Sequence, residues 1–217
     1  MTGLASLYTY KKIKSRSFIE KELKSEHWNT MYDSFKKSPN DSLEIVFLGN
    51  SITEQFDLDA FKNPHVVNRG ISGDFTEGIL HRLDEVVESK PKKIFIEIGV
   101  NDIVEFVSAK TVLENYEKIL NKIHEATPGT KIYVHSIFPI SLESSILRST
   151  KKLNVTINEV NRELQELSKK FNATYIDINS KLKFEEKLNS KYTFDGIHLN
   201  EEGYKLWKDI VEPYVNE

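Results

Sequence analysis

Short apolar runs alternate with longer amphipathic segments along most of this chain. Residues that are β-branched, aromatic or otherwise apolar dominate five short runs, at 45–48 (IVFL), 65–68 (HVVN), 94–98 (IFIEI), 132–138 (IYVHSIF) and 174–178 (TYIDI), of which HVVN is the weakest. Runs of this length with little polar alternation are typical of strands that are buried on both faces of a sheet. The pattern therefore predicts five strands.

Between and after these runs, apolar residues recur at the spacing of one helix face. Four such segments stand out, at 79–87, 112–123, 153–171 and 204–210. Strands that alternate with helices favour a parallel sheet covered on both sides. We therefore expect an α/β protein, a three-layer sandwich in which a five-stranded parallel sheet is flanked by helices.

The region before the first strand has a different pattern. Apolar and aromatic residues from Phe18 to Phe35 form a helical stripe, and Pro39 in the cluster SPND ends it. This predicts an N-terminal helical extension over residues 1–40, followed by one domain over residues 41–217. We expect the stripe to pack on that domain or on a second subunit, so a monomer and a homodimer both stay open.

Composition removes several classes of function. The formal net charge is -3 with no stripe of basic residues, so we expect no nucleic-acid partner. No segment is apolar enough over a sufficient length to suggest membrane insertion. The chain has no cysteine, which excludes disulfides, zinc sites built from thiolates and a cysteine nucleophile. The compartment stays open: cytoplasmic as written, or periplasmic or secreted if a signal peptide was removed.

Four polar clusters follow predicted strands or precede the last predicted helix. They lie at 49–51 (GNS), 68–74 (NRGISGD), 99–102 (GVND) and 195–200 (DGIHLN). In a parallel sheet, ligands and chemistry collect at the carboxyl ends of the strands, which share one edge. Each cluster alone has an ordinary explanation, since Ser51 is a suitable helix cap and the glycines suit tight turns.

Together the clusters contain the parts of a serine hydrolase. A serine becomes a nucleophile when a base removes its proton, and His198 with Asp195 three positions earlier supplies a base and a residue to orient it. Acyl transfer also requires hydrogen-bond donors for the developing oxyanion. The N–H of Gly70 and the side-chain amide of Asn101 are the candidate donors.

In their order along the chain, the four clusters resemble the four sequence blocks of the SGNH (GDSL-type) esterases, and the resemblance runs from Glu44 to Tyr214. The phrases NRGISGD and DGIHLNEEGY are similar to the branch that contains platelet-activating-factor acetylhydrolase-like and carbohydrate O-acetylesterases. The first block reads Gly-Asn-Ser, whereas the family usually has Gly-Asp-Ser. The family's aspartate organises the turn, and Asn50 can form similar hydrogen bonds.

The resemblance implies a SGNH/flavodoxin-like fold and a role for each matched residue. Ser51 would be the nucleophile, His198 the base and Asp195 its orienting acid. The oxyanion hole would combine the N–H groups of Ser51 and Gly70 with the amide of Asn101. Arg69 and Asn50, which flank these positions in the sequence, are further candidates for contact with the substrate.

The expected activity is two-step hydrolysis of a short-chain ester without cofactor or metal. The resemblance points to acetyl groups on carbohydrates such as sialic acid or xylan sugars. The substrate would be an ester of a small molecule or of an oligosaccharide. Two alternatives remain at this stage. One is a lipid or thioester acylhydrolase of the same fold, and the other is a non-catalytic α/β binding module.

Overall fold

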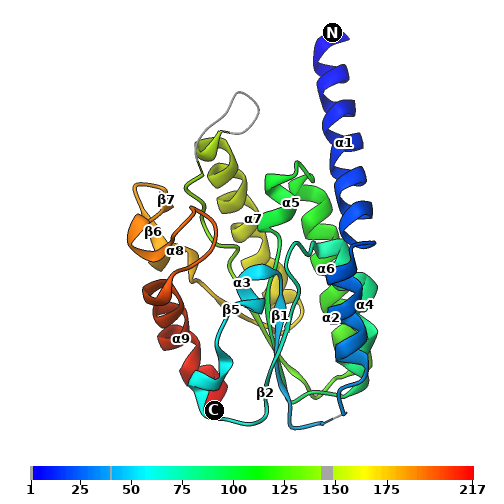
Figure 1. The fold of residues 1–217 in the computed structure, drawn as a ribbon, viewed down its shortest axis with the longest axis vertical. Coiled ribbons are helices and arrows are strands. Elements are labelled where there is room, and N and C mark those ends of the chain that lie inside the picture. The colour runs from blue at the N-terminus through cyan, green and yellow to red at the C-terminus, as the bar shows by residue number, and fades with distance from the viewer. Residues whose placement is uncertain (1, 40, 143–148) are drawn as a thin grey trace.

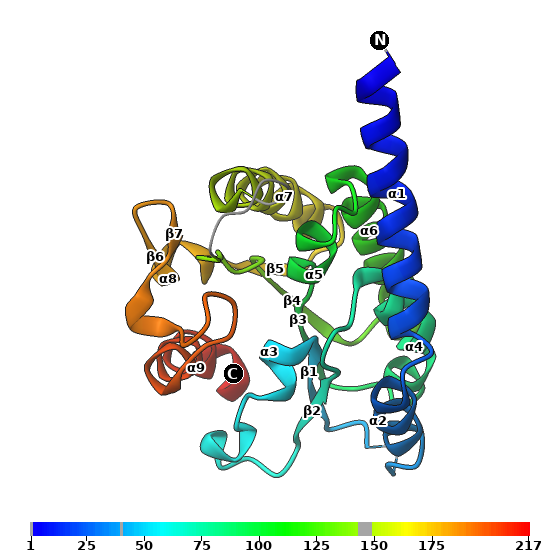
Figure 2. The same cartoon turned by 45° about the horizontal axis from the view of Figure 1, so that its top comes forward.

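A five-stranded parallel sheet forms the centre of the protein, as the sequence predicts. The computed structural model describes residues 2–39, 41–142 and 149–217. The strand order is β2-β1-β3-β4-β5 (Figure 1; all five strands are labelled in Figure 2). The strands are β1 (Ile45–Gly49), β2 (Val66–Gly70), β3 (Lys93–Glu97), β4 (Lys131–His135) and β5 (Thr174–Ile176).

Helices cover both faces of the sheet. One face carries α4 (Thr76–Glu88), α6 (Ala109–Ala126) and α7 (Thr150–Lys170), and the other lies under α9 (Glu201–Asn216) (Figure 2). The remaining short elements are α3 (Ser51–Glu54), η1 (Leu58–Phe61), α5 (Val100–Val104), α8 (Asn179–Leu182), β6 (Lys183–Phe184), β7 (Lys187–Leu188) and η2 (Ser190–Tyr192). None of the helices in the described part of the chain has the length and apolarity that a bilayer span requires.

Aromatic residues dominate the core on the α9 side of the sheet. Phe47, Phe95 and Tyr133 are register neighbours on β1, β3 and β4 and stack with ring centroids 4.7 and 4.4 Å apart. Phe56, which follows α3, stacks on Trp207 of α9 at 4.3 Å. Large aromatic rings bury much apolar area in few residues, so this packing fixes α9 against the strand ends.

The helical stripe predicted from Phe18 to Phe35 is divided between two helices. The helices are α1 (Thr2–Glu22) and α2 (Glu26–Lys36). Ser25 starts α2, because its hydroxyl accepts the N–H of Trp28 at 3.1 Å in an N-cap. The buried rings of Trp28 and Phe35 form one apolar cluster with Ile71, while much of α1 projects beyond the sheet (Figure 1).

Candidate active site

The turn after β1 presents Ser51 at the start of α3. The cap of this helix is Asn50, whose Oδ1 accepts the N–H of Ile52 at 2.8 Å. The capping role that would have explained Ser51 therefore belongs to its neighbour. Gly49 is required here, because a Cβ would lie 2.2 Å from Oγ1 of Thr53 and 2.3 Å from the carbonyl oxygen of Glu97.

Ser51, His198 and Asp195 form one chain of hydrogen bonds. Oγ of Ser51 lies 2.9 Å from Nε2 of His198, and Nδ1 of His198 lies 2.6 Å from Oδ2 of Asp195. A proton on Nδ1 leaves Nε2 free to accept the serine proton, which is the arrangement of a serine hydrolase triad. The structure thus brings together the three residues that the sequence assigned to nucleophile, base and orienting acid.

Asp195 is held as a carboxylate by several donors. Partial burial acts to raise the pKa of Asp195, but the hydrogen bonds from the His198 ring and two backbone N–H groups outweigh it, and the pKa lies below its usual value. The backbone donors are Ile197 and His198, at 2.9 and 2.8 Å from Oδ1. A carboxylate that stays ionised stabilises the imidazolium that forms during catalysis.

The loop that carries His198 is fixed at both ends. The hydroxyl of Thr193 donates to the carbonyl of His198 at 2.6 Å, and the carbonyl of Gly196 accepts the N–H of Ser141 at 2.8 Å. Asn200 caps α9, because its Oδ1 accepts the N–H of Gly203 at 3.0 Å. The position of His198, the candidate base, is therefore set by the fold itself.

Asn101 lies in α5, directly after β3, and its amide is oriented by one hydrogen bond. Nδ2 donates to the carbonyl of Asp74 at 2.9 Å, and the amide has a second N–H for another acceptor. The next residue, Asp102, accepts the N–H and the hydroxyl of Thr76 at 3.0 and 2.6 Å. Burial raises the pKa of Asp102 to about 6, and this pair joins α5 to the start of α4.

Gly70 does not fit the predicted role as an oxyanion donor. Its N–H donates to Oδ1 of Asn68 at 2.8 Å, so this donor is already used within the strand end. The glycine has a packing reason instead. A Cβ at this position would lie 2.2 Å from the backbone nitrogen of Glu54, so only glycine lets β2 approach α3.

Gly73, for which the sequence indicated only a tight turn, is the better candidate for the oxyanion donor. It has φ of +80° in the turn 71–74, which a backbone hydrogen bond of 3.1 Å closes. A second bond of 3.1 Å, from the N–H of Ile71 to the carbonyl of Gly49, holds this turn beside the turn that carries Ser51. Among the hydrogen bonds of the described residues, none uses the N–H of Gly73. The sequence signal was a second glycine in NRGISGD, at the place where a turn needs positive φ.

A buried ion pair supports the same turn. Oδ2 of Asp74 accepts Nε of Arg82 at 2.9 Å, and Oδ1 accepts Nε1 of Trp28 at 3.1 Å. Arg82 also donates to the carbonyls of Gly49 and Arg69, at 3.1 and 2.8 Å. Burial raises the pKa of Asp74 even though the charge of Arg82 opposes this. One arginine thus ties together the ends of β1 and β2 and the turn that follows.

The two predicted substrate contacts outside the triad are wrong on structural grounds. The side chain of Arg69 is buried between Glu44 and Glu85, at 3.5 and 3.4 Å, and its guanidinium lies over the ring of Phe35. Asn50 has 0% exposure and serves as the cap described above. Neither side chain is accessible to a substrate.

An exposed aromatic ring lies beside the base. Phe194 stacks on the imidazole of His198 with ring centroids 5.8 Å apart and an angle of 12° between the planes. Phe194 is 67% exposed, although it adjoins the candidate catalytic residues Asp195 and His198. A ring with an open face at this point is available to the part of a substrate that approaches His198.

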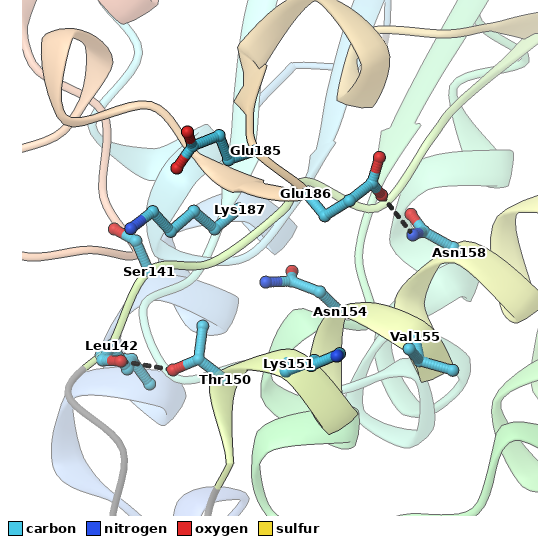
Figure 3. Close-up of a pocket in the computed structure, with 10 residues that line it drawn as sticks. All are labelled: Ser141, Leu142, Thr150, Lys151, Asn154, Val155, Asn158, Glu185, Glu186 and Lys187. Carbon is cyan, nitrogen blue, oxygen red and sulfur yellow. Dashed lines mark hydrogen bonds between the residues drawn. The ribbon is translucent and has the colours of Figure 1, made fainter.

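A hollow of about 620 Å³ lies on another part of the surface (Figure 3). It is bounded by α7 and the β6–β7 hairpin, where Asn158 donates to Glu186 at 3.4 Å. None of the catalytic candidates lines it. Within the described residues, no cluster of three or more histidine, aspartate or glutamate side chains is arranged to hold a metal ion.

Comparison with known proteins agrees with this fold. The family model of the GDSL-like lipase/acylhydrolase family matches residues 47–206. The chain belongs to this family. Its members are acylhydrolases, so the chain is classed with ester hydrolases that act on small-molecule esters.

Individual relatives give a narrower view. A structure described as a platelet activating factor from Streptococcus pneumoniae is 28% identical, with a TM-score of 0.76, over 92% of this chain and 95% of that one. The rat platelet-activating factor acetylhydrolase IB subunit alpha2 is 28% identical over 87% of this chain and 81% of its own length. An Escherichia coli N-acylneuraminate cytidylyltransferase is also 28% identical over 83% of this chain. The matched region spans only 42% of that protein.

Proposed function

We propose that this protein is a serine esterase that removes short acyl groups, in the first place acetyl, from carbohydrate esters. The observation that carries the proposal is the unbroken chain of hydrogen bonds from Ser51 through His198 to Asp195, with distances of 2.9 and 2.6 Å. A binding module has no need of a base aligned on a serine and oriented in turn by a carboxylate.

The reaction proceeds in two steps. Nε2 of His198 takes the proton of Ser51 while the serine oxygen attacks the ester carbonyl. The resulting oxyanion accepts hydrogen bonds from the N–H groups of Ser51 and Gly73 and from the amide of Asn101. His198 then returns the proton to the leaving alcohol, and water hydrolyses the acyl-enzyme by the same route in reverse. No metal or organic cofactor takes part.

Two observations support the choice of substrate. The name of one relative is that of an acetylhydrolase, and the name of another contains an N-acylneuraminate, a sugar acid. The exposed ring of Phe194 beside His198 offers an apolar face to a sugar ring in the leaving group. Sialic acid and xylan sugars are the carbohydrates we place first.

A panel of esters tests the proposal. We expect kcat/KM on p-nitrophenyl acetate to exceed that on the octanoate, and we expect acetate release from O-acetylated sialic acid or acetylated xylan. A fluorophosphonate probe should label Ser51, and Ser51→Ala should lose both labelling and hydrolysis while it keeps the wild-type melting temperature. Ser180→Ala, at an exposed serine of α8, is the matched control.

The outcomes separate the alternatives. Labelling without hydrolysis of any ester would identify a different acyl substrate such as a thioester. A tenfold or greater preference for octanoate would overturn the short-acyl assignment in favour of a lipid acylhydrolase. Absence of labelling at Ser51 in folded protein would leave a binding module.

A further inference from the structure

Two ionisable side chains lie side by side inside the protein and take no part in the reaction. Glu97 ends β3 and pairs in register with Gly49 of β1. Ile96 of β3 pairs in register with Val134 of β4. Glu97 and His135 are the next residues of these two strands, so they lie side by side. By strand alternation both point to the α9 face, where the ring of His135 lies 5.7 Å from that of Trp207.

The polar atoms of this group have no protein partner. Both carboxyl oxygens of Glu97, both ring nitrogens of His135, Nε1 of Trp207 and Oγ1 of Thr53 are buried and form no hydrogen bond in the structure. Buried polar groups in native proteins nearly always pair with protein or with ordered water. Several unpaired donors and acceptors at one place indicate a ligand that can both donate and accept.

This group of four side chains, Glu97, His135, Thr53 and Trp207, adjoins the short helix α3 that begins at Ser51. Thr53 belongs to the helix that begins at Ser51, and its hydroxyl reaches the space that a side chain at Gly49 would fill. The same space borders the backbone of Glu97. From α9, the hydroxyl of Tyr204 donates to the carbonyl of Ile52 at 2.9 Å. Tyr204 therefore ties the first turn of α3 to α9, beside the place where Thr53 meets this group.

Electrostatics favours neutral forms of the ionisable members. Burial raises the pKa of Glu97 to about 8 and lowers that of His135 to about 3. The other titratable groups near Glu97 are Tyr204 of α9 and Tyr116 of α6, and burial raises the pKa of each, so both are neutral as well. A neutral carboxyl and a neutral imidazole each offer one donor and at least one acceptor, which matches the hydrogen bonding of water.

We propose that Glu97, His135, Thr53 and Trp207 enclose an internal binding site for ordered water, and that Glu97 is a positioning residue for Ser51 through this site. Water held between the carboxyl of Glu97 and the hydroxyl of Thr53 links β3 to the first turn of α3. The direction in which Ser51 presents its hydroxyl to His198 then depends on this link.

A crystal structure at high resolution tests the site without reference to activity. We expect ordered water within hydrogen-bond distance of the Glu97 carboxyl and of at least one of the other three side chains. A direct hydrogen bond between Glu97 and His135 with no water beside it would overturn the proposal. A dry contact of all four side chains would overturn it as well.

Two variants of equal size test the positioning role, and this arm rests on the proposed esterase function. Glu97→Leu removes every hydrogen bond, whereas Glu97→Gln keeps a donor and an acceptor. We expect Glu97→Leu to lower kcat on p-nitrophenyl acetate by on the order of tenfold with little change in KM, because small displacements of a reacting group are costly. Glu97→Gln should restore most of kcat.

Melting curves establish that both variants are folded before their rates are compared. Equal kcat in folded Glu97→Leu and wild type would show that Glu97 does not position Ser51. Equal losses in the leucine and glutamine variants would contradict a role through hydrogen bonding. If wild-type protein hydrolyses no ester, the proposed function fails, while the crystal structure still decides the water site.

Discussion

The hydroxyl oxygen of Ser51 lies 2.9 Å from Nε2 of His198, although 147 positions separate the two residues in the chain. Ser51 begins a short helix after the first strand, and His198 lies in the loop before the last helix. Their contact is a product of tertiary packing, in which Phe56 stacks on Trp207. Each of the two loops also carries its own local hydrogen bonds, so the catalytic geometry combines two separately ordered turns.

Loss of the triad aspartate should lower the rate by no more than loss of the triad histidine. We expect His198→Ala to lower kcat by up to about 10⁶-fold, because it removes the base. Asp195→Asn should lower kcat by about 10⁴-fold or more, and at most by as much as His198→Ala does. The measurement is kcat on p-nitrophenyl acetate. His65→Ala is a matched control, since His65 forms a hydrogen bond of 2.9 Å with Asp41 away from the site. A larger loss for Asp195→Asn than for His198→Ala would contradict these roles.

Asn101→Ala should lower kcat by about 10²–10³-fold and change KM little, because one oxyanion donor acts mainly in the transition state. Stopped-flow or steady-state rates on an activated acetate ester give the value. Asn121→Ala, on an exposed position of α6, provides the control. An unchanged kcat in folded Asn101→Ala would remove this residue from the oxyanion hole.

Phe194→Ala should weaken the binding of esters with large leaving groups and leave the binding of esters with small leaving groups unchanged. A lost aromatic contact costs about 0.5–1.5 kcal/mol, so KM for an acetylated sugar should rise by roughly two- to tenfold, while ethyl acetate should be unaffected. Phe184 is 59% exposed on the β6–β7 hairpin, and Phe184→Ala is the matched control. Equal effects on both esters would indicate that the ring serves only to hold His198.

Arg82→Met should destabilise the fold strongly. It leaves the carboxylate of Asp74 buried without its cation, and removal of one partner of a buried ion pair costs about 3–5 kcal/mol. Urea unfolding measures the loss. Arg16→Met breaks exposed ion pairs with Glu20 and Glu77 and should cost about 1 kcal/mol or less. Similar losses in the two variants would show that Asp74 finds another partner.

Glu97→Gln should change how stability depends on pH. The pKa of Glu97 is raised from 4.5 to about 8 in the folded state, so its contribution is complete below pH 4.5 and is lost as the pH rises toward 8. Across this window, the free energy of unfolding of the variant should rise relative to that of wild type by up to about 1.4 kcal/mol for each pH unit. Urea unfolding between pH 4.5 and pH 8.5 checks this. Parallel curves for the two proteins would mean that Glu97 titrates normally.

The strands and the triad were predictable because their signals are local or ordered along the chain. Runs such as IVFL and IFIEI form strands since both faces of the sheet are covered, and all five residues of β1 and of β3 are buried. The pairing of Ser51 with His198 followed from the order of four clusters at one sheet edge. These inferences needed residue types and spacing but no side-chain geometry.

Other features depend on contacts that the sequence does not encode locally. The choice between Gly70 and Gly73 turns on the side chain of Asn68, which takes the N–H of the former. The break between α1 and α2 depends on a cap at Ser25 within a continuous apolar stripe. Arg69 was a candidate for substrate contact in the sequence, but its side chain is buried and pairs with Glu44, just before β1, and with Glu85 of α4.

The docking of α9 has a consequence for synthesis on the ribosome. The turn that carries Ser51 leaves the exit tunnel before α9 is made. Two contacts with this region form only with α9, because the hydroxyl of Tyr204 donates to the carbonyl of Ile52 and the ring of Trp207 stacks on Phe56. A nascent chain that ends before residue 195 contains Ser51 but neither Asp195 nor His198. Under the proposed mechanism the serine of such a chain is not activated, and we expect hydrolysis only after α9 has folded onto the sheet and holds the turn at Ser51.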